Sequence, residues 1–198
     1  MNIYIVRHGY TDENHKGTYY GALDPGINKN GKKQCELIRK EIENINFDKI
    51  YISSKKRAKE TANLIVSKKI EFYTDKRLDE RNFGVFEGKE YKYLMENYSK
   101  EYKEWEEDWI NYKIPNGESH KDFSLRIYEF LDEILQIYKE NDNILLVTHA
   151  GVIRVIYTYV MNKDIALFWK FASHNGDLSL IKYEYGNIFI DFIKHNKE

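Results

Sequence analysis

The sequence is poor in the residues that mark secreted or loosely linked proteins. Cys35 is the one cysteine among 198 residues, so the chain cannot form an internal disulfide, and we expect a reducing compartment such as the cytoplasm. Pro25 and Pro115 are the two prolines, and the sequence has no Pro-rich hinge, repeat or low-complexity linker. The length and these absences predict a single domain over residues 1–198.

The sequence also lacks long hydrophobic runs and an excess of either charge. Its N-terminal apolar run ends at Arg7, too early for a signal peptide or a membrane span, and no later run is long enough to cross a bilayer. The 31 basic side chains nearly balance the 32 acidic ones. This balance argues against nucleic-acid and membrane partners, although it is compatible with a local basic pocket.

What the sequence does contain is an alternation of short apolar runs with segments of helical periodicity. Strands are predicted at 3–6, 49–53, 70–74 and 143–148, with a C-terminal hairpin of 178–184 and 187–193. Predicted helices are one capped by Asn28 with Cys35, Ile38, Ile42 and Ile45 inward, one capped by Ser54, one over 90–112, one capped by Ser119 with Phe123, Ile127, Phe130, Ile134 and Tyr138 inward, and one over 152–161. The alternation predicts an α/β fold, a three-layer α/β/α sandwich with a mostly parallel central sheet.

Two of the predicted strands end in similar polar residues. Arg7 and His8 follow the first strand, and Thr148 and His149 end and follow the fourth. Ligands of open parallel sheets bind beyond the carboxyl ends of the strands. We therefore expect both histidines at one site.

A phosphate group would give each of these residues a chemical role. Arg7 offers a fork of donors, and Arg57 would add charge in the first turn of its helix, where an anion is already favoured. His8 would attack phosphorus and form a phosphohistidine, while His149 would donate a hydrogen bond to a developing charged oxygen. The amide of Ala150 would assist at the start of the next helix.

The reaction also needs a proton for the leaving oxygen. Glu80 is the predicted donor and Glu87 the reserve, because negative phosphate oxygens favour the protonated form of a nearby carboxyl group. Gly9 is expected to let the backbone turn tightly and approach the ligand.

Each feature alone has a plainer interpretation. A histidine at a strand end is often structural, the stretch SSKKRAKETA is by itself a solvated charged helix, and LDERNFGVFEG is by itself a polar loop. Metal binding by His8 and His149 is a further alternative, but no third ligand with an evident metal spacing stands out. We therefore predict no metal and no cofactor.

In combination, these motifs resemble the histidine phosphatase superfamily, the phosphoglycerate mutase-like enzymes. The similar stretches are RHGYTDEN, YYGALDPGINKNGKKQ, SSKKRAKETA, LDERNFGVFEG, PNGES and VTHAGVIR, in that order. The resemblance implies the phosphoglycerate mutase-like fold, catalysis by His8, Glu80 and His149, and phosphate binding by Arg7, Arg57, Asn14 and Ala150. For substrate binding it points to Thr11, Tyr20, Gly21 and Glu87. Tyr10, Pro25-Gly26 and Ala150 depart from the family pattern, which leaves the pocket rim and the substrate open.

The resemblance is strongest to the short bacterial phosphatases of that family. It implies a metal-independent phosphomonoesterase, a cytoplasmic monomer or homodimer that hydrolyses a small phosphorylated metabolite such as α-ribazole 5'-phosphate. The alternatives are a 2,3-bisphosphoglycerate-dependent phosphoglycerate mutase and a non-catalytic phospho-ligand-binding protein. The mutases tend to be longer, and a pure binder needs neither a nucleophile nor an acid.

A segment of about 75–118 is predicted to form a lid that determines specificity. Its candidate residues are Phe83, Phe86, Trp105, Trp109 and 114–118. The alternative is that Trp105 and Trp109 simply pack this segment onto the core.

Overall fold

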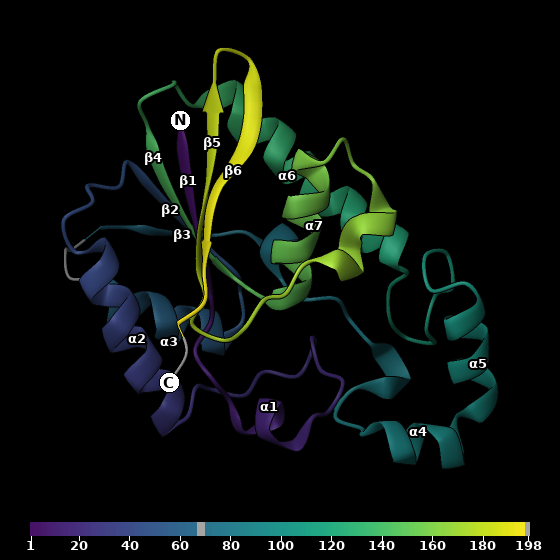
Figure 1. Cartoon of the computed structure of the whole chain (residues 1–198). Coiled ribbons are helices and arrows are strands. Elements are labelled where there is room, and N and C mark those ends of the chain that lie inside the picture. The colour runs from purple at the N-terminus through teal and green to yellow at the C-terminus, as the bar shows by residue number, and fades with distance from the viewer. Residues whose placement is uncertain (67–69, 197–198) are drawn as a thin grey trace.

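The computed structural model describes residues 1–66 and 70–196, which contain a six-stranded sheet between two helical layers (Figure 1). Across the sheet the order is β3 (Phe72–Thr74), β2 (Lys49–Ile52), β4 (Asn143–Thr148), β1 (Asn2–Arg7), β5 (Leu178–Glu184) and β6 (Asn187–Lys194). The first four of these are parallel, whereas β5 runs antiparallel to β1 and β6 antiparallel to β5. The predicted α/β class with a mostly parallel sheet is confirmed.

Both faces of the sheet are covered, which explains the unbroken apolar strands. The helices α6 (His120–Ile137) and α7 (Ala150–Val160) cover one face and pack on Ile3, Ile5 and Leu146. On the other face, α2 (Lys29–Ile42) and α3 (Lys56–Ile65) pack on Val6 and Val147. Within the described residues, none of the helices has the length and apolar character needed to cross a membrane.

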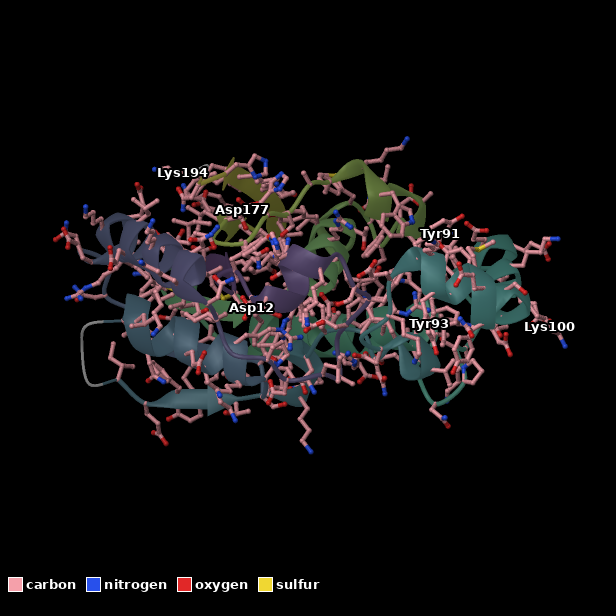
Figure 2. The ribbon with its side chains drawn as sticks, turned by 90° about the horizontal axis from the view of Figure 1, so that it is seen from below. Asp12, Tyr91, Tyr93, Lys100, Asp177 and Lys194 are labelled. Carbon is pink, nitrogen blue, oxygen red and sulfur yellow. The ribbon has the colours of Figure 1, made fainter. Side chains whose placement is uncertain are left out.

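The remaining elements gather at the carboxyl end of the parallel strands (Figure 1). They include α1 (Asp12–Lys16), α4 (Tyr91–Asn97) and α5 (Ser99–Glu107), with short 3-10 turns at Lys76–Leu78, Gly84–Phe86 and Ile165–Lys170. Figure 2 looks at this end from below, with Asp12 of α1 near the middle and Tyr91, Tyr93 and Lys100 of α4 and α5 to one side. A third apolar cluster lies here, formed by Phe86, Leu94, Tyr102, Trp105 and Ile114.

Two predicted helix caps are confirmed and one is wrong. The Asn28 side chain accepts from the amides of Asn30 and Gly31, and Ser119 accepts from that of Asp122. Ser54, in contrast, does not cap α3, because its amide and hydroxyl donate to Asp79 at 2.7 and 2.6 Å. The Lys56 amide at the start of α3 instead donates to Asp24, a carboxylate from another loop.

Some predicted boundaries are also wrong. The helix predicted over 90–112 divides at Tyr98, where the backbone leaves helical geometry while the Tyr98 ring packs on Phe86. Ile45 and Tyr138 lie beyond the ends of α2 and α6, and β3 begins at Phe72 rather than at residue 70.

The central strand β4 should be the most sensitive part of the sheet. Leu146 is fully buried between β1 and β2, so Leu146→Ala should lower the free energy of unfolding by about 2–5 kcal/mol, by lost burial and a residual cavity. Leu37→Ala is the control, since that side chain is 41% exposed, and it should change stability by less than about 0.5 kcal/mol. Urea unfolding checks both values, and equal effects would contradict this account of the core.

Candidate active site

Two histidines meet at the carboxyl end of the sheet because their strands are adjacent and in register. Arg7 at the end of β1 pairs with Thr148 at the end of β4, so the next residues, His8 and His149, lie side by side. Their ring centroids are 5.1 Å apart, and the residues are 3% and 0% exposed. The two strand-end histidines therefore lie next to each other, as the sequence predicts.

Hydrogen bonds define which nitrogen of each ring carries its hydrogen. His8 Nδ1 lies 2.8 Å from the Gly9 carbonyl, which can only accept, so Nδ1 carries the hydrogen and Nε2 keeps its lone pair. Arg57 Nε donates to His149 Nδ1 at 3.2 Å, so His149 carries its hydrogen on Nε2. That Nε2 is 2.7 Å from Ser53 Oγ, which in turn donates to Asp79.

Both imidazoles are held in the neutral form. Burial, and then the charges of Arg57 and Arg7, lower the pKa of His8 well below its usual value. Burial also lowers the pKa of His149, followed by the charge of Arg57 and, further down, that of Arg7. A neutral His8 with a free Nε2 lone pair has the form that a nucleophile requires.

Two arginines flank the histidines, one fully buried and one partly buried. Arg57 of α3 is fully buried, and its terminal nitrogens donate to the carbonyls of Leu23 and Gly21 at 2.7 and 3.0 Å. Arg7 Nη1 donates to the Ser173 carbonyl, while its Nε has no partner among the described residues. No carboxylate of the described chain forms an ion pair with either guanidinium, so their positive charge is available to an anion.

Glu80 lies at the N-terminus of α7. Its carboxylate accepts from the amide of Gly151 at 3.0 Å and from the amide of Arg81 at 2.9 Å. A cavity of about 200 Å³ connects it with the histidine site; the lining residues are Arg7, His8, Asn14, Thr18, Tyr19, Tyr20, Arg57, Glu80 and Phe83. The predicted nucleophile, acid and two arginines thus share one cavity.

The other predicted site residues divide into two groups. Asn14 and Tyr20 line this cavity, and Ala150 lines the one beside it. Thr11 is fully buried, and its hydroxyl forms hydrogen bonds with the side chains of Asn14 and Tyr20. It therefore positions two residues that line the cavity. Gly21 has no room for a side chain, because a Cβ there would lie 1.8 Å from the Arg81 carbonyl oxygen.

Glu87 differs from its predicted role as reserve acid and substrate ligand. Its carboxylate accepts the amides of Gly21, Ala22, Leu23 and Phe83 at 2.8–3.1 Å. These bonds hold the loop that places Tyr20, and Glu87 does not line the cavity among the described residues. Gly9 also differs from its predicted role of approaching the ligand. It packs against the backbone of α2, where a Cβ would lie 2.6 Å from the Gly31 carbonyl oxygen.

The structure adds residues that sequence reasoning missed. Asn175 is 7% exposed, and its Nδ2 donates to the His8 carbonyl at 3.0 Å and lies 3.4 Å from His8 Nδ1. Ser53 is 0% exposed, and its hydroxyl contacts His149. The only sequence signal for Ser53 was its place at a strand end; for Asn175 there was none. No group of three or more His, Cys, Asp or Glu side chains in residues 1–66 and 70–196 is placed to hold a metal ion.

The predicted specificity residues lie in two different environments. Phe83 lines the cavity, and Trp105, which is 8% exposed within the third apolar cluster, lines the cavity beside it. Phe86 and Ile114 are fully buried. Trp109 packs on His120, with ring centroids 4.6 Å apart.

His120 should make stability depend on pH. Burial, and then the charge of Arg81, lower its pKa to about 3. In the unfolded chain the imidazole is protonated below about pH 6.5, whereas in the folded chain it stays neutral. Its contribution to the free energy of unfolding is therefore present above that pH and is lost as the pH falls, by roughly 1.4 kcal/mol per pH unit. His120→Phe should therefore flatten the decline in unfolding free energy between pH 7 and pH 5. Equal declines in both proteins, measured by urea unfolding, would contradict the burial of a neutral imidazole.

Comparisons with known proteins identify similar sequences and structures. Residues 3–196 match the model of the histidine phosphatase superfamily (branch 1). Phosphoserine phosphatase 1 of Hydrogenobacter thermophilus is 30% identical over 185 residues, covering 93% of this chain and 87% of that protein. Adenosylcobalamin/alpha-ribazole phosphatase of Escherichia coli is 28% identical over 182 residues, covering 91% and 90%. The structure of the alpha-ribazole phosphatase from Shigella flexneri superposes with a TM-score of 0.90 at 27% identity, covering 98% and 96%.

Proposed function

Because the chain belongs to the histidine phosphatase superfamily, we propose that it is a metal-independent phosphomonoesterase that acts on a small phosphorylated metabolite through a phosphohistidine on His8. The observation that carries the proposal is the neutral His8, with Nε2 free, in one cavity with Arg7, Arg57 and Glu80. Relatives named for phosphoserine and for α-ribazole make both kinds of phosphate ester candidate substrates.

The first half-reaction transfers the phosphoryl group to the protein. Arg7 and Arg57 bind the phosphate oxygens, and His8 Nε2 attacks phosphorus from the side opposite the ester oxygen. The N–P bond forms as the P–O ester bond breaks, and the carboxyl group of Glu80 gives its proton to the leaving oxygen. His149 Nε2–H exchanges Ser53 Oγ for a phosphoryl oxygen and stabilises the charge that develops there.

The second half-reaction returns the protein to its starting state. The Glu80 carboxylate takes a proton from water, the resulting hydroxide attacks phosphorus, and the N–P bond breaks to release inorganic phosphate. The named relatives are phosphatases, which supports water as the acceptor, so the mutase alternative is not favoured. A single buried cysteine supports a cytoplasmic location.

Removal of the nucleophile tests the proposal. We expect His8→Ala to lower kcat for p-nitrophenyl phosphate by about 10³-fold or more, as nucleophile deletions do, while the circular dichroism spectrum is unchanged. His15→Ala is the matched control, because His15 is exposed and does not line the cavity, and it should retain wild-type turnover. Wild-type-like turnover by His8→Ala would remove the mechanism.

Chelation tests the metal-independent part. The positive charge that faces the phosphate comes from Arg7 and Arg57, so EDTA should leave the rate of phosphate release unchanged. Loss of activity on chelation, with recovery on adding zinc or magnesium, would show that a metal takes part.

A further inference from the structure

A second cavity adjoins the phosphate cavity and is not needed to hold the phosphate. Its volume is about 170 Å³, and it shares the walls formed by Tyr19, Glu80 and Phe83 with the first. Ala150 and Gly151 at the start of α7 form another part of its lining. The two cavities therefore meet at Glu80, the proposed proton donor.

The position of Glu80 determines which part of the substrate the second cavity receives. An in-line attack by His8 expels the ester oxygen on the opposite side of phosphorus, and the acid must lie within hydrogen-bond reach of that oxygen. The leaving group consequently extends past Glu80 into the second cavity. The leaving group must then be chemically complementary to the residues that line that cavity.

Arg81 brings a buried and incompletely paired guanidinium to this cavity. The residue is 5% exposed, and its Nε donates to the Glu118 carbonyl at 3.2 Å. Its Nη2 has no hydrogen-bond partner among the described residues. Burial lowers the pKa of Arg81 and the charge of Glu118 raises it, but the Glu118 carboxylate pairs with Arg126 at 2.8 Å and forms no ion pair with Arg81. A buried guanidinium N–H without an acceptor is unfavourable and indicates that a ligand supplies one.

Arg154 of α7 brings a second guanidinium to the same cavity. Its Nε is also buried without a partner in the described part of the chain. Its guanidinium carbon lies 5.7 Å from the Phe168 ring centroid and 5.4 Å from that of Trp169, so both rings lie near its charge. Neither arginine forms an ion pair with a carboxylate among residues 1–66 and 70–196.

The remaining walls do not carry enough negative charge to neutralise both arginines. His120 lines the cavity and stays neutral, because burial and Arg81 lower its pKa to about 3. The lining contains one acid, Glu80, against two guanidinium groups. The cavity therefore has an excess of positive charge in surroundings that contain several aromatic rings.

We propose that the leaving group of the natural substrate is small and carries a carboxylate, which Arg81 and Arg154 bind in the second cavity. The inference rests on the proposed phosphatase function and names its substrate class. A guanidinium fork matches the two oxygens of a planar carboxylate. The volume, close to the roughly 150 Å³ of a benzene-sized cavity, suits a leaving group of a few heavy atoms better than a nucleoside.

Matched phosphate esters test the proposal in the wild-type protein. O-Phosphoserine and O-phosphoethanolamine differ only in the carboxylate, and 3-phosphoglycerate is matched with glycerol 3-phosphate. We expect kcat/KM to be about 10- to 100-fold higher for the carboxylate member of each pair, the size of a charge-assisted hydrogen bond. Equal values within both pairs, or a higher value for α-ribazole 5'-phosphate than for any carboxylate ester, would overturn it.

Substitution of the arginines shows whether they cause the preference. Arg154→Met should reduce the preference within each pair about 10-fold or more, mainly through a higher KM for the carboxylate member. Arg81→Met should do the same, and a thermal melt checks that this more buried variant is folded. Arg39→Met on the exposed side of α2 is the control and should keep the wild-type ratios. A ratio that survives both cavity substitutions in folded protein would contradict the assignment.

The two proposals fail in different ways. Absence of phosphate release from p-nitrophenyl phosphate and from all of the paired esters would refute the phosphatase function itself. Release from p-nitrophenyl phosphate and from the esters without any carboxylate preference would refute the second cavity's role alone.

Discussion

The packing of Arg57, fully buried, and Arg7, partly buried, beside two neutral histidines is the constraint on which the rest of the structure depends. Positive guanidinium groups and imidazoles removed from water are unfavourable unless each has partners or an anion to bind. Arg57 is stabilised by two carbonyls and by His149, whereas Arg7 Nε has no partner in the described chain. The same charges that would attract a phosphate keep His8 unprotonated, so the pocket binds the anion and maintains the nucleophile with one set of groups.

The supporting loops show how the fold maintains this arrangement. Asp79 accepts from both the amide and the hydroxyl of Ser54 and from Ser53, and Ser53 in turn contacts His149. The Glu87 carboxylate accepts hydrogen bonds from four backbone amides. These bonds fix the loop whose carbonyls at Gly21 and Leu23 accept hydrogen bonds from Arg57. These carboxylates act at one remove from the reacting atoms, as is common where a site must be held within a fraction of an ångström.

The parts of this molecule that follow from local sequence could be predicted, and those that depend on distant contacts could not. Apolar runs ending in Arg7-His8 and Thr148-His149 locate the strand ends, and Asn28 and Ser119 satisfy amides within three residues of themselves. Ser54 does not cap α3 because it donates instead to Asp79, which is 25 residues away and therefore not evident from the local sequence. Asn175 reaches His8 across a separation of 167 residues, and no periodicity reveals such a contact. The structural role of Glu87 is hidden in the sequence because three of its four amide partners, those of Gly21, Ala22 and Leu23, lie on another loop.

The most direct test of the central claim is a rapid-quench experiment with a ³²P-labelled phosphomonoester, followed by peptide mapping of the labelled protein. The account predicts a label on His8 that is stable to alkali and labile to acid, that forms and decays at rates consistent with turnover, and that is absent from His8→Ala. Turnover at the wild-type rate with no phosphorus attached to His8 at any time, or with an acid-stable label on another residue, would contradict it.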